Sequence, residues 1–270
     1  MRKWAWILAV AALALAGSSC KMLQSRDQIN KGVVAFKNTQ YPEAVEHFKT
    51  AVELDPGFIT ARLYLATAYM LQYIPGAVSP ENDKMAAAAL SEFTKVLEQE
   101  PRNTVAIGYI ASLYLNQKKW DQAREWYQKL TSVDPNNADA YYSLGFIAWS
   151  EWYPEYGGAK ARLGMKQEDP GPIKDKKVKE ELKAKYGQVI ENGLQALNKC
   201  LQINDQYEDA MAYENLLIRE RADLEDSKDR YEAQIKIADE WMAKALATKK
   251  QKTEKKSKSG GGIVAEPSQK

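Results

Sequence analysis

The sequence predicts an all-α protein, built as a solenoid of antiparallel helix pairs. One observation is a set of small and bulky residues that recurs along the chain at fixed gaps. The other is composition: 45% of the 270 residues are hydrophobic and 27% are charged, with only 15 glycines and 10 prolines. Such a chain can bury a substantial core between amphipathic helices. We expect about four helix pairs followed by a C-terminal capping pair.

The repeat is defined by residues whose successive gaps are 12, 4, 3 and 5: Gly32, Ala44, Phe48, Ala51 and Pro56. The same four gaps recur at Ala111, Ala123, Tyr127, Leu130 and Pro135. Two other copies keep the last three gaps but lengthen the first by 11 and by 36 residues: Ala66, Ala89, Phe93, Val96 and Pro101, then Gly145, Gly193, Leu197, Cys200 and Asp205. Without these two insertions the period is 34 residues.

A 34-residue period with small residues at the helix crossings resembles the tetratricopeptide repeat, a helix-turn-helix unit. The resemblance implies a right-handed superhelix, with a peptide-sized groove left by the stacked pairs. The solenoid is expected over residues 28–247, with copies at about 25–58, 59–103, 104–137 and 138–207 and the capping pair at 208–247. The second copy contains an insertion, and the fourth contains one at 150–192, followed by an unusually long helix.

Residues 1–19 have the pattern of an export signal, with Arg2 and Lys3 before a mostly apolar run and small residues before Cys20. Residues 17–20, GSSC, resemble the bacterial lipobox, which implies a lipid on Cys20. Residues 14–16, ALA, also suit ordinary cleavage, and a retained membrane anchor is a third alternative, although the apolar run is short for a span. We favour lipidation because the chain has only one other cysteine, and that one occupies a core position of the repeat.

The segments that flank the solenoid carry the remaining predictions. Residues 20–27 are expected to be a short tether. Lys21, rather than aspartate, follows the cysteine, which in the lipoproteins that this segment resembles favours the outer membrane over the inner. Residues 248–270 are rich in lysine and lack apolar periodicity, so we expect a disordered tail. The expected location is therefore the periplasm-facing side of a bacterial envelope membrane.

Charge and residue types exclude several kinds of function. The net charge is +2, and removal of Arg2 and Lys3 with the signal brings it to zero, so nucleic acid is not an expected partner. His47 is the single histidine, and the cysteines lack the spacing of metal ligands. There is no glycine-rich phosphate loop. We therefore expect no catalytic residue, no metal site and no cofactor.

The first helix of each pair supplies a stripe of residues that should line the concave side of the stack. Its spacing is i, i+4, i+7, which is one helical face. The expected partner-binding groove contains Leu63, Tyr64, Thr67, Met70, Tyr109, Ser112, Leu115, Asn116, Tyr142, Phe146, Trp149 and Tyr213. These residues are mainly apolar and aromatic. In an alternative interpretation, the 150–192 insertion or the last helix fills this groove.

Two functions are compatible with these features. The favoured one is a non-enzymatic scaffold at a bacterial envelope membrane that binds a protein of the cell envelope through the groove. The alternative is an envelope enzyme subunit or a protein that binds glycan or peptidoglycan. It would use Trp152, Tyr153 and Tyr156 of the insertion as a platform on which sugar rings stack.

Overall fold

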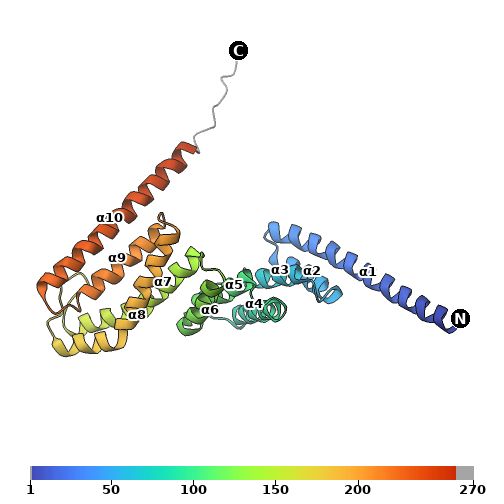
Figure 1. Ribbon diagram of the computed structural model, residues 1–270, viewed down its shortest axis with the longest axis horizontal. Coiled ribbons are helices and arrows are strands. Elements are labelled where there is room, and N and C mark those ends of the chain that lie inside the picture. Colours follow the sequence, from blue (N-terminus) through green and yellow to red (C-terminus); the bar gives the residue numbers. More distant parts are fainter. Residues whose placement is uncertain (1, 260–270) are drawn as a thin grey trace, which may run out of the picture. The chain divides into compact units, whose positions relative to one another are not determined.

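The computed structural model describes the backbone of residues 2–259 and the side chains of residues 20–255. All regular secondary structure in that part of the chain is α-helical, which confirms the predicted all-α class (Figure 1). The helices are α1 (Arg2–Lys37), α2 (Tyr41–Leu54), α3 (Ile59–Met70), α4 (Pro80–Gln99), α5 (Thr104–Asn116), α6 (Trp120–Val133), α7 (Ala138–Arg162), α8 (Lys176–Ile203), α9 (Glu208–Ala222) and α10 (Lys228–Ser259). They form two compact units, the first ending at Trp126 and the second beginning at Tyr127.

In the first unit, consecutive helices pack as pairs, α1 with α2 and α3 with α4 (Figure 1). The crossing of α1 and α2 explains the small residue of the repeat. A Cβ atom added at Gly32 would lie 2.5 Å from Cε1 of Phe48, so only a hydrogen fits where the helices meet. Ala44 and Ala51 are fully buried on the same side of α2. The fixed gaps in the sequence therefore mark the contact points of crossing helices.

The extra residues of the second copy form a loop and a longer second helix. Ser79 caps α4 by accepting a hydrogen bond from the backbone N of Asn82, and Pro80 occupies the first turn. The buried Asn82 side chain then holds the loop. Its Oδ1 accepts from the backbone N of Ile74 at 2.7 Å, and its Nδ2 donates to the carbonyl oxygens of Ile74 and Ala77 at 2.9 and 2.8 Å. The loop is thus fixed by three hydrogen bonds to one side chain.

In the second unit, the long insertion extends both helices of the fourth pair. α7 has 25 residues and α8 has 28, which confirms the prediction that the second helix of the fourth copy is unusually long. The crossing repeats the geometry of the first copy, since a Cβ at Gly145 would lie 2.4 Å from Cγ of Leu197. Cys200 is fully buried, and burial raises the pKa of its thiol to about 12. The prediction that Cys200 is a small core residue is confirmed.

A buried polar network closes the loop between α7 and α8. Lys160, 1% exposed, donates from Nζ to Oδ2 of Asp223 at 3.0 Å and to the carbonyl oxygens of Gln167 and Asp169 at 3.0 and 2.8 Å. The hydroxyl of Tyr156 also donates to Asp223, at 2.7 Å. The carbonyl oxygen of Asp223 accepts from the backbone N of Ile173 at 2.8 Å. The insertion is therefore fastened to the end of α9 by charge and by hydrogen bonds.

The capping pair packs as expected, with α9 lying along α10 (Figure 1). Asn215 occupies the place where the other copies have glycine or alanine. It is 1% exposed, and its Nδ2 donates to the carbonyl oxygen of Ala238 at 2.7 Å. The larger residue is accommodated because its amide group satisfies a backbone group of the neighbouring helix.

The flanking segments differ from the predictions. Residues 20–27, the expected tether, are helical, and the hydroxyl of the buried Ser25 donates to the carbonyl oxygen of Ala51 at 2.8 Å. The helix of the first copy thus packs from before Gln28. At the other end, α10 continues to Ser259, and the side chain of Thr248 is buried, so disorder does not begin at residue 248. Residues 260–270 lie outside the described part, as do the side chains of the expected signal, 1–19.

In the part of the chain that the structure describes, no helix has the length and apolar character needed to cross a membrane.

Candidate functional site

Four of the predicted groove residues meet in the second unit. Tyr142, Phe146 and Trp149 follow one side of α7, and Tyr213 comes from α9. All four are partly exposed. The ring of Tyr213 lies 5.8, 5.4 and 5.2 Å from the rings of Tyr142, Phe146 and Trp149, with interplanar angles of 64° to 89°. Such edge-to-face contacts are favourable for aromatic rings. We call these four residues the aromatic face.

Two further rings extend the aromatic face and were not among the predicted groove residues. Tyr153 stacks on Trp149 with a centroid distance of 4.6 Å, and Tyr207 stacks on Tyr142 at 5.0 Å. Tyr153 follows Trp149 by four residues, so continuation of the i, i+4 stripe would have found it. Tyr207 lies just before α9 and has no such signal in the sequence.

Hydrogen bonds fix some of these rings more firmly than others. Nε1 of Trp149 donates to Oε1 of Glu220 at 3.1 Å, and the hydroxyl of Tyr207 donates to Oδ1 of Asp139 at 2.9 Å. Glu220 is 5% exposed, and burial raises the pKa of its carboxyl group to about 7. Phe146 has no hydrogen-bonding group in its side chain and lies beside Tyr142, Trp149 and Tyr213. It is partly exposed and, unlike those three rings, is not packed against the core cluster between α7 and α8, so we expect its loss to disturb the fold least.

The insertion does not provide the exposed platform of the alternative function. Trp152 is fully buried and Tyr156 is 5% exposed, because both pack in the core between α7 and α8. Only Tyr153 is partly exposed, and it lies against Trp149 with its hydroxyl donating to Oε1 of Gln167 at 2.7 Å. The prediction of an aromatic sugar-stacking platform made of Trp152, Tyr153 and Tyr156 is wrong.

The other predicted groove residues belong to the first unit, on α3 and α5. They are partly or largely exposed: Leu63, Tyr64, Thr67, Met70, Tyr109, Ser112, Leu115 and Asn116. Two of their rings lie on core rings of the repeats, since Tyr64 stacks on Phe48 at 5.2 Å and Tyr109 lies 5.2 Å from Phe93. These residues thus form a partly apolar surface supported from beneath.

Groups that could support metal binding are sparse. The side chain of His47 is engaged, since Nδ1 lies 2.8 Å from Oε1 of Gln28 and Nε2 lies 4.0 Å from Glu43. No three residues of the types His, Cys, Asp and Glu are grouped as metal ligands in the described part of the chain.

Comparison with known proteins identifies the repeats. Tetratricopeptide repeat models match residues 29–103 and 83–145. Among solved structures, the crystal structure of MamA protein superposes with a TM-score of 0.58 at 14% identity, covering 90% of this chain and 98% of that one. The chain therefore contains tetratricopeptide repeats and has a solenoid fold of that type.

Curated relatives match at low identity and over part of their length. The mitochondrial import receptor subunit TOM70 of Rattus norvegicus is 22% identical over 203 residues, which are 75% of this chain and 27% of the relative. The Hsp70-Hsp90 organizing protein 3 of Arabidopsis thaliana is 29% identical over 115 residues, which are 43% of this chain and 19% of the relative. The chain thus spans less than a third of the length of these relatives.

Proposed function

We propose that this protein is a non-enzymatic scaffold that binds a protein partner through the aromatic face while a lipid on Cys20 anchors it to a bacterial envelope membrane. The observation that carries the first half of the proposal is the aromatic face itself. Its four rings are partly exposed, the ring of Tyr213 contacts each of the other three, and they lie on α7 and α9. Large aromatic side chains on such a surface supply much of the binding energy of protein interfaces.

The relatives support a binding function in general terms. Their names describe an import receptor subunit and an organizing protein for two chaperones, and both are functions of binding other proteins.

The chemistry of the aromatic face indicates which kind of partner segment it can bind. The N–H group of Trp149 is already donated to Glu220, and Phe146 has no polar group, so these two rings present apolar surface. The matching partner is a segment with exposed apolar side chains, such as one face of an amphipathic helix.

Phe146→Ala tests this function. Because Phe146 is partly exposed and makes no side-chain hydrogen bond, the variant should keep its helical content by circular dichroism while losing capture of the partner from a bacterial envelope extract. Ile237→Ala is the matched control, since Ile237 is an apolar side chain 43% exposed on α10. The control should capture the partner normally. Equal capture by wild type and Phe146→Ala would exclude the aromatic face as the binding surface.

The membrane anchor rests on the sequence around Cys20. Cys20 is exposed and carries a free thiol, so its sulfur is accessible. We expect Cys20→Ser to leave the precursor unprocessed or to release the protein from the membrane fraction, and Cys200→Ser to leave membrane retention unchanged. Fractionation of cells into outer membrane, inner membrane and soluble periplasm, followed by immunoblotting, measures both. Membrane retention of a normally processed Cys20→Ser protein would contradict lipidation.

A further inference from the structure

The charge of α10 changes along its length. Residues 228–243 contain three basic and four acidic residues, whereas residues 244–259 contain seven lysines and one glutamate. The sequence predicted disorder from residue 248, but the helix continues through this lysine-rich half to Ser259. Because a helix holds the lysines close together, their charges add to one strongly positive field at this end of α10.

α9 pairs with only part of the lysine-rich half. Lys252 forms a salt bridge with Glu208, which is the first residue of α9. α10 therefore continues past the end of the helix on which it packs (Figure 1). Lys249, Lys250 and Lys255 are exposed and form no salt bridge with another described side chain. Their charges are available to a partner outside the protein.

Exposed apolar side chains lie beside these lysines. Met242 is 36% exposed, and Leu246, four residues later, is 61% exposed. Lys249 and Lys250 follow Leu246 by three and four residues, and Thr253 follows it by seven. Side chains at this spacing share one face of a helix. We call these five residues the basic face of α10.

The combination of apolar and basic side chains selects among anionic partners. A nucleic acid or another soluble polyanion is bound mainly through charge, which leaves an exposed leucine in water. A bilayer that contains anionic lipid offers two interactions at once. Its headgroups attract lysines, and the boundary with the acyl chains buries apolar side chains. A helix with basic and apolar residues together is typical of segments that lie on a membrane surface.

We propose that the basic face of α10 binds the surface of a bilayer that contains anionic lipid. Lys249 and Lys250 pair with lipid phosphates, and Leu246 enters the boundary between headgroups and acyl chains. The opposite side of the helix stays packed on α9 through contacts such as that of Lys252, so binding does not require the pair to open. This contact goes beyond the anchor at Cys20 and does not depend on it, because all of its residues belong to α10.

The probe is a vesicle of phosphatidylcholine, prepared with or without phosphatidylglycerol. The full-length chain carries an environment-sensitive fluorophore on Thr253→Cys in a Cys20→Ser background, where the remaining thiol, that of Cys200, is fully buried. We expect the emission to shift to shorter wavelength with phosphatidylglycerol vesicles and not with phosphatidylcholine alone. The label reports on α10 itself, whether or not the N-terminal segment also attaches to the vesicle. Salt at about 1 M, where the Debye length is about 3 Å, should weaken the shift.

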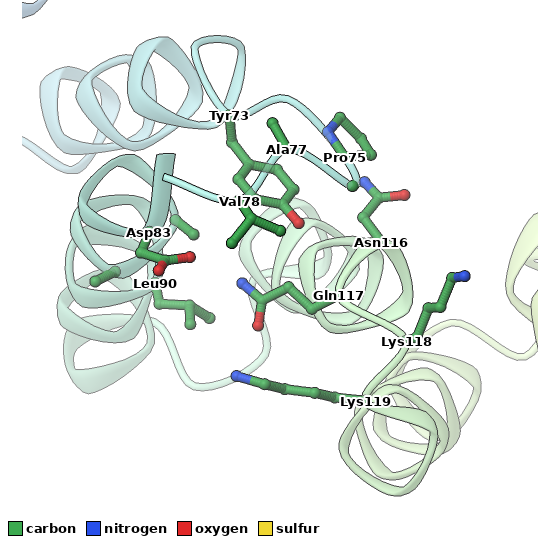
Figure 2. A pocket seen from close by; sticks show the side chains of 13 residues that line it. Tyr73, Pro75, Ala77, Val78, Asp83, Leu90, Asn116, Gln117, Lys118 and Lys119 are labelled. Atoms are coloured by element: carbon green, nitrogen blue, oxygen red, sulfur yellow. The ribbon is translucent and has the colours of Figure 1, made fainter. Parts of the chain in front are cut away.

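A double charge reversal tests the lysines. Lys249→Glu with Lys250→Glu should raise the lipid concentration needed for half of the shift by about tenfold or more, because each lysine near an anionic surface strengthens binding several-fold. The matched control is Lys118→Glu with Lys119→Glu. Figure 2 shows these two lysines at the turn from α5 to α6, beside a hollow that Asp83 also lines. The control makes the same charge change and should leave the lipid requirement within about twofold.

Leu246→Ser distinguishes a bilayer from a soluble polyanion. It should raise the lipid requirement by about threefold or more, because the apolar contact is lost. Every changed residue is exposed, so circular dichroism should show unchanged helical content. The proposal is overturned if phosphatidylglycerol vesicles cause no shift, if phosphatidylcholine alone causes the same shift, or if the Lys249→Glu, Lys250→Glu variant behaves like wild type. It is also overturned if Leu246→Ser behaves like wild type, because the face would then recognise negative charge without entering a bilayer.

Discussion

The two units differ in how their helices are held together. In the first unit, the buried residues are mostly apolar, from Ala44 and Phe48 to Phe93. Its buried polar groups are few: Ser25 and Asn82 bond to backbone groups, and Arg62 of α3 pairs with Glu92 of α4. In the second unit, five polar side chains are buried: Lys160, Glu214, Asn215, Glu220 and Asp223. Lys160 and Asp223 bond to Tyr156, and Glu220 accepts from Trp149. Close-packed crossings suffice for compact repeats. The longer helices of the fourth pair need polar contacts to fix an inserted loop, and these contacts give the second unit its specific shape.

The largest expected effect is at the buried ion pair of the second unit. Asp223→Asn preserves the shape of the side chain but removes the charge that faces Lys160. Breaking a buried ion pair on one side costs about 3 to 5 kcal/mol, so the free energy of unfolding in urea should fall by about that amount. Asp239→Asn is the matched control, because Asp239 is 63% exposed and pairs with Arg219 at the surface. It should cost less than about 1 kcal/mol.

Equal stability of the Asp223→Asn and Asp239→Asn variants would mean that the network around Lys160 does not distinguish the second unit from the first. Apolar packing would then hold the insertion, as it holds the compact pairs.

The same comparison explains how far the sequence predicted the fold. The helix pairs, their crossings at Gly32 and Gly145 and the long helix α8 follow from spacing, because spacing along a helix determines which residues face a neighbour. The pairing of Lys160 with Asp223 joins residues 63 apart in the sequence, and no period relates them. Charged residues on helices are normally solvated, so nothing in the sequence marked these two as buried.

The sequence also predicted part of the candidate site. The stripe on α7 predicted Tyr142, Phe146 and Trp149, and the structure places Tyr213 of α9 among them. Their role in partner binding stays a prediction. The burial of Trp152 could not be predicted, since an insertion has no equivalent position in the other repeats.

The second largest expected effect tests the close helix crossing, a feature that both units contain. Gly145→Ala should destabilise the protein by about 2 to 3 kcal/mol, because the new methyl group would overlap the side chain of Leu197 and overpack the crossing. Gly187→Ala is the matched control on α8, where a Cβ would meet no atom within 4 Å. It should stabilise the protein by about 0.5 to 1 kcal/mol, since alanine favours the helix. If thermal unfolding shows the same shift for both, the repeat positions assigned to the fourth copy are wrong.

The smallest expected effect is the pH dependence of stability that the buried carboxyl group of Glu220 causes. Burial raises the pKa of Glu220 to about 7, so below pH 4.5 the group is protonated in both states and has no effect. As pH rises from about 4.5 to 7, the unfolded chain loses this proton first, and the folded state loses stability.

Glu220→Gln removes that titration while keeping an oxygen to accept from Nε1 of Trp149. We expect the variant to be more stable than wild type by about 1 to 2 kcal/mol at pH 8 and to show no such gain at pH 4. Glu232→Gln, at a site 60% exposed on α10, should follow the wild-type pH curve. Urea unfolding from pH 4 to 8 measures all three proteins. A gain at pH 8 would mean that the buried carboxylate of Glu220 lowers the stability of the folded protein. If Glu220→Gln instead follows the wild-type curve, Glu220 ionises in the folded state as readily as a surface carboxylate, and its burial has no cost in stability.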